Sequence, residues 1–391
     1  MSALSRRSLM AAALWLGLTS AAPAVEPVKI GIALSMTGNL ADSAEHYRKA
    51  IELWRDQVNA RGGLLGRPVE LVIYDERSDP ATAARLYEKL ITDDKVDLLV
   101  APWGSASTAT ATAVAEKHKR VIINAGGASE KIQQRGFRYV VQSASPISAY
   151  VEGVAPLMAQ NGAKSFTMVS RDFNAARDMT AELDKVVKSG ALTMVASEYF
   201  PAGTSDYSSA IAKARQQAPD AWISIAYPNE AIEMIKQFRA NNYLPKIFIS
   251  NGVSQEDFIK STGKDGEYAF GISLYEPGVK TKGNPEFVKT FEAKYGYPPG
   301  YYAGFGYSGV TVLEDAVKKA GTLDQDTLRA TLGEMETDTV LGHYKIDPKT
   351  GSQLGAKGLL IQVLKGNREI VWPEELKTAD AVVPMPPWDK R

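Results

Sequence analysis

The sequence predicts an α/β protein of two doubly wound parallel-sheet lobes joined by a multi-stranded hinge. First, apolar strands alternate strictly with amphipathic helices, which is typical of a parallel sheet covered on both faces. Second, this alternation runs twice, over residues 28–143 and 146–270. Third, the chain after residue 270 is too irregular for a third domain. A length of 391 residues agrees with two domains rather than one.

The first set opens with the apolar strand 28–34. An amphipathic helix follows, because apolar residues recur at steps of three and four: Ala44, Tyr47, Ile51, Trp54 and Val58. Gly62 and Gly63 end that helix. We expect the other strands of this set over 69–74, 96–101 and 121–123, and the other helices from Asp79-Pro80 and over 108–118.

The second set repeats the pattern. Its strands are expected over 166–170, 192–199, 221–226 and 247–250, and its helices over 175–188, 207–217, 230–241 and 255–261. The tail then holds two expected helices, 284–296 and 303–320, and short strands and turns over 337–372.

The tail is predicted to cross back and complete both lobes. On this division, the first lobe comprises 28–145 plus about 275–335, the second 146–274 plus about 336–372, and 373–391 form a C-terminal tail. Two lobes joined by several crossings form a hinge with a cleft between them.

Residues 1–24 are predicted to be a signal peptide. A short basic segment with Arg6 and Arg7 precedes a ten-residue apolar run, 9–18, which is too short to span a bilayer. Small residues at 22–24 then offer a cleavage site. The sequence therefore predicts a soluble periplasmic protein. General secretion and twin-arginine export both stay open, since the arginine pair fits either route.

Composition excludes several classes of function. Lys+Arg and Asp+Glu each number 45, and no basic run exceeds two residues, so no nucleic-acid partner is expected. Cysteine is absent, which excludes disulfides and thiol chemistry. The three histidines, His46, His118 and His343, show no metal-binding spacing. We therefore predict no metal and no cofactor.

Two patterns could suggest an enzyme. Residues 304–309 match GxGxxG, but no buried strand precedes them, and we interpret the glycines as places where a helix packs closely against a neighbour. Asp75-Glu76 follows a strand and could serve acid–base chemistry. We interpret that pair instead as a solvated turn before the next helix, and we expect no enzymatic activity.

Two small, polar turns follow neighbouring strands of the first lobe. They span 104–108 and 124–129. Because ligands bind beyond the carboxyl ends of parallel strands, and helix N-termini attract anions, these turns predict half of a carboxylate site. The candidate residues are Ser105, Ala106, Gly126, Gly127, Ala128 and Ser129. The alternative is that Ser105 or Ser107 merely caps a helix.

Three turns at strand ends supply candidates from the second lobe. They contain Phe173, Tyr227 and Asn251. The two aromatic rings could enclose a ligand, or each could simply cover the edge of the sheet. A site between two lobes would bury most of a small solute.

Several motifs together resemble periplasmic solute-binding proteins of the branched-chain amino acid ABC importer family. The pattern from Val58 to Val69 carries most of the resemblance, with Tyr74-Asp75, Gln134 to Phe137 and Tyr302-Ala303. The resemblance implies the type I periplasmic-binding fold with three hinge crossings. It also implies a monomer that closes on a small-molecule solute and delivers it to an inner-membrane permease.

The resemblance also assigns roles to residues. It implies that Ser105 and the turn 126–129 hold a carboxylate and that Tyr227 is the family's aromatic position. The two acidic positions that hold an α-ammonium group fall near Ile147 and Asn251, and neither is acidic. A buried ammonium without a carboxylate partner is costly.

An aromatic or aliphatic acid therefore fits these residues better than an amino acid. Branched-chain amino acids, short amides and urea stay open as solutes. A ligand sensor of the same fold that signals to a membrane receptor also stays open, whereas an exported enzyme or a purely structural module is disfavoured.

Overall fold

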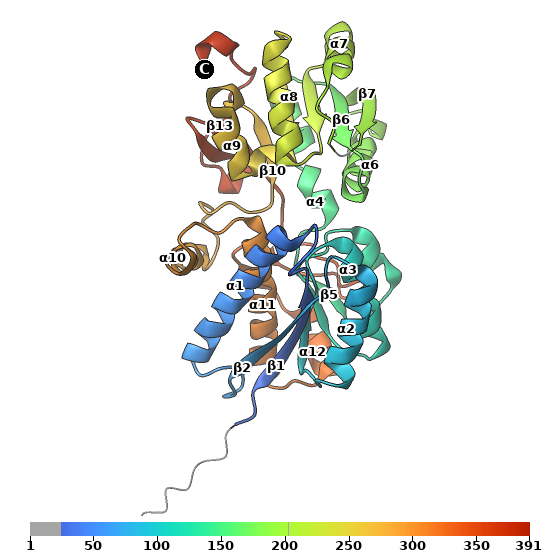
Figure 1. The fold of residues 1–391 in the computed structure, drawn as a ribbon, viewed down its shortest axis with the longest axis vertical. Coiled ribbons are helices and arrows are strands. Elements are labelled where there is room, and N and C mark those ends of the chain that lie inside the picture. Colours follow the sequence, from blue (N-terminus) through green and yellow to red (C-terminus); the bar gives the residue numbers. More distant parts are fainter. Residues whose placement is uncertain (1–24, 202) are drawn as a thin grey trace, which may run out of the picture.

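The chain folds into two α/β lobes, as Figure 1 shows for a computed structural model that describes residues 25–201 and 203–391. The predicted fold class is confirmed, since each lobe has a sheet of mainly parallel strands between helices. The predicted signal peptide, residues 1–24, lies outside the described residues.

The first lobe contains a five-stranded parallel sheet in the order β2-β1-β3-β4-β5. Its strands are β1 (Val28–Leu34), β2 (Val69–Asp75), β3 (Leu98–Val100), β4 (Ile122–Asn124) and β5 (Val140–Gln142). The order changes direction between β1 and β3. Such a point, at the carboxyl ends of the strands, is where open α/β sheets bind ligands.

Helices cover both faces of this sheet. They are α1 (Ala41–Ala60), α2 (Pro80–Thr92) and α3 (Ser105–Lys117), and the 3₁₀ helix η1 (Glu130–Arg135) follows β4. The predicted apolar stripe of α1 is buried against one face, with Tyr47 and Trp54 almost fully enclosed. Tyr87 of α2 packs on the other face. Burying a large apolar side chain contributes roughly 1.5–3 kcal/mol.

The second lobe contains a seven-stranded sheet in the order β14-β13-β10-β9-β8-β6-β7. Its strands are β6 (Ser165–Arg171), β7 (Thr193–Phe200), β8 (Ala221–Ser224), β9 (Ile247–Ser250), β10 (Phe270–Ser273), β13 (Leu359–Leu364) and β14 (Asn367–Trp372). The strand β13 runs antiparallel to β10, and β14 runs antiparallel to β13. Both come from the end of the chain. This lobe is therefore complete only when the chain has returned to it.

Helices also flank the second sheet (Figure 1). They are α4 (Ile147–Val151), α5 (Val154–Gln160), α6 (Asn174–Lys188), α7 (Ser208–Gln217), α8 (Pro228–Ala240) and α9 (Glu256–Thr262), with 3₁₀ turns η2 (Asn251–Ser254) and η3 (Gly263–Gly266). The helices α6 and α8 begin directly after Phe173 and Tyr227, so the sequence places both aromatic residues at helix starts.

Three helices of the tail pack on the first lobe: α10 (Asn284–Tyr295), α11 (Tyr301–Ala320) and α12 (Gln325–Glu334). Trp54 Nε1 of α1 donates to Glu314 Oε2 of α11 at 2.7 Å. A Cβ atom on Gly306 would lie 2.6 Å from the Tyr47 carbonyl oxygen. The prediction that the glycines of 304–309 serve close helix packing is therefore confirmed.

The predicted assignment of 336–372 to the second lobe is wrong for its first half. The hairpin β11 (Thr337–Thr339) and β12 (Gly342–Tyr344) lies on the first lobe, where Ser308 Oγ donates to Thr339 Oγ1 at 2.9 Å. Gln142 N likewise donates to the Gly351 carbonyl at 2.9 Å. Short strands carry no local signal for the sheet they will join, so only tertiary packing decides this.

The chain crosses between the lobes three times, after β5, after β10 and after β12. Gln353 ties the first and third crossings together, since its backbone N–H donates to Gln142 Oε1 at 3.2 Å and its amide donates to the Ser143 carbonyl at 3.4 Å. The last residues run along the second lobe, where Met385 N donates to the Lys246 carbonyl at 2.9 Å.

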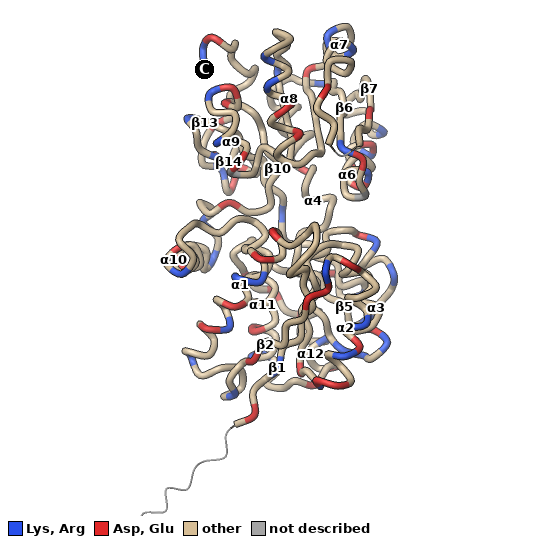
Figure 2. The backbone as a smooth tube through the Cα atoms, viewed as in Figure 1, with Lys and Arg blue, Asp and Glu red and all other residues tan. Residues whose placement is uncertain are grey.

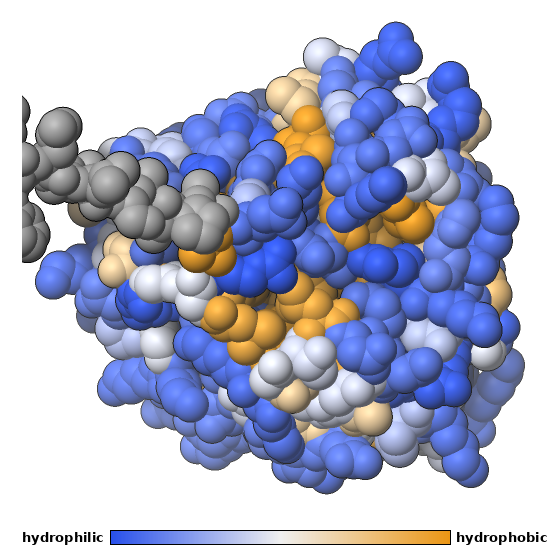
Figure 3. Space-filling view, turned by 90° about the horizontal axis from the view of Figure 1, so that it is seen from below, coloured by the Kyte–Doolittle hydropathy of each residue, from blue (hydrophilic) through white to orange (hydrophobic). Residues whose placement is uncertain are grey.

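Charged residues of both signs are interspersed over the two lobes (Figure 2). The free end of the first lobe is mostly hydrophilic, with small apolar patches between polar side chains (Figure 3). Among the described residues, no helix is both long and apolar enough to cross a bilayer. Because charges of both signs are mixed over the surface, the electrostatic potential at a site depends mainly on the charged groups close to it.

Candidate ligand site between the lobes

The two polar turns of the first lobe lie side by side. Ser105 is the first residue of α3, and its Oγ accepts a hydrogen bond from Ser129 N at 3.2 Å. Gly104 N donates to the Gly126 carbonyl at 3.0 Å. The structure thus brings together the candidates that sequence analysis drew from separate strand ends.

The alternative role of Ser105 or Ser107 as a helix cap is wrong. Gly104 occupies the N-cap position of α3 with φ of 98°, and no side chain caps the helix. Ser107 Oγ instead donates to Glu76 Oε2 at 2.8 Å. The N–H groups of the first turn of α3 can therefore point toward an anion, as helix N-termini commonly do.

The second turn is rigid. Asn124 bridges it, because its amide donates to the Gly127 carbonyl at 2.9 Å while its Oδ1 accepts from Gly127 N at 2.8 Å. A Cβ atom on Gly126 would lie 2.3 Å from the Pro102 carbonyl oxygen, and one on Gly127 would lie 2.8 Å from Thr108. Position 126 therefore requires glycine, because its backbone lies against that of Pro102, whereas a side chain at 127 would need Ile132 and Thr108 to move.

Glu76 lies buried behind these turns. Ser35 Oγ and Ser107 Oγ both donate to its carboxyl group. Burial raises the pKa of Glu76, and the serine hydroxyls oppose that effect. The prediction that Asp75-Glu76 forms a solvated turn is wrong for Glu76, whose side chain is directed inward and links the ends of β1 and β2 to α3.

Phe173 and Tyr227 form one aromatic surface on the second lobe. Their rings are stacked with centroids 5.4 Å apart and an interplanar angle of 29°. Tyr227 is 41% exposed, which is unusual for a large aromatic residue. The exposed part of Tyr227 is therefore available for contact with a ligand at this surface.

Arg171, which sequence analysis missed as a site residue, supports this surface. Its guanidinium carbon lies 4.7 Å from the Tyr227 ring centroid, and Nη1 pairs with Glu230 Oε1 at 3.1 Å. The signal was present in the sequence, since Arg171 ends a strand two residues before Phe173. The cation holds the ring and offsets the charge of the buried Glu230.

Asn251 acts on the backbone rather than pointing freely toward a ligand. Its Oδ1 accepts a hydrogen bond from Ala226 N at 2.7 Å. A Cβ atom on the adjacent Gly252 would lie 2.7 Å from the Tyr227 carbonyl oxygen. Asn251 therefore fixes the turn that presents Tyr227.

A second group of aromatic residues was missed in the sequence. Trp103 packs edge-on against Tyr302 with ring centroids 4.8 Å apart, and Tyr302 lies 4.1 Å from Tyr301. Burial raises the pKa of the Tyr227 phenol, and Tyr302 raises it further. The phenol groups of the two lobes thus influence one another across the gap. Tyr301 and Tyr302 stand just before the glycine motif 304–309 of α11. This pair of adjacent aromatic residues is the sequence feature that could have indicated them.

A hollow of about 290 Å³ opens beside these tyrosines. Its lining comes from both lobes and from the second crossing, with Asp42, His46, Tyr301 and Tyr302 on one side and Ser254, Gln255, Tyr275 and Glu276 on the other. None of the predicted site residues lines it, but Tyr302 packs on Trp103, which directly precedes the turn 104–108. This hollow is therefore lined by phenol, carboxylate and hydroxyl groups together with the His46 imidazole and the Arg368 guanidinium.

The comparison with known proteins agrees with the two-lobed fold. A family model described as periplasmic binding protein matches residues 27–367. This chain belongs to the periplasmic binding protein family. That family consists of solute-binding proteins rather than enzymes, and its members are periplasmic.

Individual relatives of this periplasmic binding protein are distant but match about nine tenths of the chain. The Leu/Ile/Val-binding protein homolog 7 of Brucella abortus is 23% identical, over 93% of this chain and 96% of the relative. A branched-chain amino acid transporter substrate binding protein of Streptococcus pneumoniae, solved with isoleucine, is 24% identical with a TM-score of 0.77, over 89% of this chain and 100% of that one.

A further solved structure is a solute binding protein of an ABC transporter from Rhodopseudomonas palustris in complex with 3,4-dihydroxybenzoic acid. It is 23% identical with a TM-score of 0.76, over 92% of this chain and 98% of that chain. These likenesses establish the fold. The solute has to be argued from the residues of this binding protein.

The positions expected to hold an ammonium group lack acids in this binding protein. Ile147 is buried, at 4% exposed, and Asn251 is engaged with the backbone. Glu230 is the buried carboxylate closest to Tyr227 in sequence, and Arg171 already pairs with it. Among the described residues, no group of three or more His, Asp or Glu could hold a metal ion.

Proposed function

We propose that this periplasmic binding protein captures a small carboxylate-bearing solute, in the first place an aromatic acid, and delivers it to an inner-membrane ABC permease. The observation that carries the proposal is the stacked Phe173–Tyr227 pair, with Tyr227 exposed and no carboxylate at Ile147 or Asn251. An aromatic ring gains both burial and stacking there. A branched-chain amino acid is the second candidate, since relatives carry that name.

The first lobe would hold the carboxylate. The Ser105 hydroxyl and the N–H groups of the first turn of α3, Ala106 included, are donors at the start of α3. The turn 126–129 lies beside them, although the N–H groups of Gly127 and Ser129 already donate to Asn124 and Ser105. Hydrogen bonds from such donors to an ionised carboxylate contribute roughly 1.5–3 kcal/mol each. Because Asn124 locks the turn in place, these donors need little reorganisation on binding.

The second lobe would hold the ring. When the lobes close, the exposed part of Tyr227 would contact the solute, and Tyr301 and Tyr302 would offer phenol groups for ring hydroxyls. A solute shifts the open–closed equilibrium only by its difference in affinity for the two states. Contacts from both lobes supply that difference, and a permease can then recognise the closed form.

The experiment is a calorimetric titration of residues 25–391 with benzoate, 3,4-dihydroxybenzoate, leucine and urea. We expect the two aromatic acids to bind and leucine and urea to bind at least tenfold more weakly. Thermal unfolding gives a second readout, because a ligand at 100 times its dissociation constant stabilises the fold by about 2.7 kcal/mol. Tight leucine binding without aromatic-acid binding would contradict the proposal.

The export route, the monomeric state and the permease are part of the same proposal. A signal peptide over 1–24 would direct the chain to the periplasm by the general or the twin-arginine route. Cleavage after residue 24 in a secreted fraction, read by mass spectrometry, would test the signal peptide. A neighbouring permease gene would favour transport over a sensor role.

A further inference from the structure

A second hollow lies at the hinge, apart from the site between the lobes. Its volume is about 210 Å³. Four stretches of chain line it: 274–281 of the second crossing, the hairpin residues 340–343, residues 355–359 of the third crossing, and 375–376. Tyr275 also borders the hollow of about 290 Å³ between the lobes, whereas none of the residues proposed to hold the solute lines this cavity.

The walls of this hinge cavity are mostly apolar. They include Leu274, Val279, Val340, Leu341, Leu359 and Leu376. The first five are buried, at 8% exposed or less. Leu376 is half-buried and closes the cavity from the side of the second lobe.

The polar groups of the walls already have partners within the protein. Tyr275 OH donates to Asn284 Oδ1 at 2.7 Å, and Thr281 Oγ1 donates to the Val340 carbonyl at 2.7 Å. Lys357 pairs with Glu375 at 2.8 Å. These side chains are therefore engaged with one another, and the hollow opens to solvent on the side of Lys357 and Glu375.

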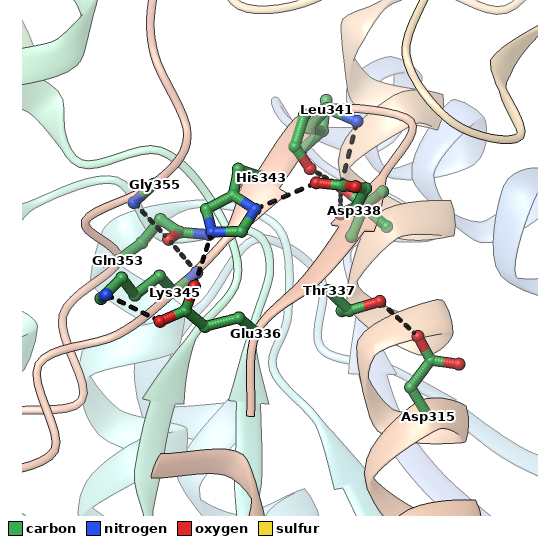
Figure 4. A network of polar contacts seen from close by, with 12 residues as sticks. Asp315, Glu336, Thr337, Asp338, Leu341, His343, Lys345, Gln353 and Gly355 are labelled. Atoms are coloured by element: carbon green, nitrogen blue, oxygen red, sulfur yellow. Dashed lines mark hydrogen bonds and ion pairs between the residues drawn. The ribbon is translucent and has the colours of Figure 1, made fainter. Parts of the chain in front are cut away.

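His343 stands at the rim and is held in place. Figure 4 shows its ring between two acids: Nδ1 lies 3.0 Å from Asp338 Oδ1, and Nε2 lies 3.2 Å from Glu336 Oε2. Lys345 pairs with Glu336 at 2.7 Å, and Gly355 packs against the His343 carbonyl, which a Cβ would approach to 2.6 Å. The rim is therefore a fixed polar frame around an apolar interior.

We propose that the hinge cavity is a second binding site, for a small apolar ring compound. An enclosed apolar cavity of about 150 Å³ accommodates benzene, so a volume of 210 Å³ is sufficient for a substituted single ring. The ring would lie against the apolar walls, and its polar edge would face the open side. It touches both lobes at once, since Val340 lies on the first lobe and Leu376 on the second.

The test uses 4-fluorotoluene as the probe and ¹⁹F NMR of residues 25–391 as the readout. We expect saturable binding in the wild-type protein. Leu376→Trp and Val340→Phe fill the cavity from opposite walls, and each should weaken binding at least tenfold. Each variant is checked first by its thermal unfolding midpoint, and the half-buried position 376 keeps the test usable if the hairpin variant does not fold.

Tyr227→Ala separates this site from the site between the lobes. If the probe occupies the hinge cavity, this variant binds it as the wild type does, although it loses the aromatic solute. Absence of saturable binding, or binding that Tyr227→Ala removes and Leu376→Trp leaves intact, would overturn the proposal. Neither result depends on the identity of the solute.

Discussion

The two lobes face the proposed solute with different kinds of groups. The first lobe presents backbone and small hydroxyl groups in turns that Asn124 and Ser105 lock by hydrogen bonds. The second lobe presents side chains, with Phe173 stacked on a largely exposed Tyr227. A rigid backbone can recognise the common group of a solute class, whereas exposed rings can select among its members. We therefore expect substitutions in the two lobes to have different effects on solute binding and on stability.

The largest effect should come from Gly126→Ala in the first lobe. The new Cβ would lie 2.3 Å from the Pro102 carbonyl oxygen, so the turn has to move. We expect a loss of about 1–3 kcal/mol in the free energy of unfolding, and a fall in solute affinity of about 100-fold. Denaturant unfolding and calorimetry measure the two effects.

Gly278→Ala is the matched control, because a Cβ there meets nothing within 4 Å and the φ angle is ordinary. It should leave both quantities nearly unchanged. Equal losses in the two variants would show that the tight turn has no special importance.

Tyr227→Ala should weaken aromatic-acid binding by about 10- to 30-fold, or roughly 1.4–2 kcal/mol, with little effect on unfolding. The side chain is 41% exposed in the absence of solute, so its removal creates no cavity. Calorimetry with benzoate measures the loss. Tyr227→Phe keeps the ring and should retain most of the affinity, and a loss as large as that of the alanine variant would mean that the phenol, not stacking, matters.

The residues of these two predictions also show which parts of the candidate site could be predicted from the sequence. Gly126 and Tyr227 were found because each follows a strand, and the strand–helix alternation is a local pattern. Trp103, Tyr301 and Tyr302 were missed because they meet only when the tail returns to the first lobe. The burial of Glu76 was also missed because its contacts are distant in sequence. Its serine partners lie 41 and 31 residues away.

A further contrast concerns carboxylates at the ends of the two sheets. In the second lobe, Asp220 accepts from Lys246 Nζ at 2.7 Å and from Lys164 N at 2.9 Å, and these contacts lower its pKa. A lowered pKa contributes stability above the ordinary value near 3.8, and this stability is lost as the pH falls through the lowered value. Asp220→Asn should therefore cost about 1–2 kcal/mol at pH 7 and nothing in strong acid.

Glu76 in the first lobe should behave in the opposite sense. Its raised pKa makes the folded state less favourable as the pH rises above the ordinary value of 4.5. Glu76→Gln should remove that dependence and leave the protein at least as stable at pH 7. Hydrogen exchange resolved by lobe distinguishes the two variants, and a pH profile shared by both would contradict the contrast.

The smallest effect is expected from Ser105→Ala. It removes the acceptor of the 3.2 Å bond from Ser129 N, and a hydrogen bond of this kind contributes about 1 kcal/mol. Solute affinity should fall about fivefold, and the selectivity between benzoate and leucine should stay constant. A change in selectivity would mean that the first lobe also discriminates between solutes.

The contact between Trp54 and Glu314 joins residues 260 positions apart. The apolar face of α1 is therefore without its partner helix until most of the chain has been synthesised, and the second sheet waits even longer for β13 and β14. Contacts so distant in sequence slow folding, because the entropy of closing a long loop is lost before the contacts form and stabilise the fold. A ribosome making this protein carries an unfinished first lobe for about 300 residues, and we expect that a chain stopped before α11 would be cleared by proteases rather than accumulate.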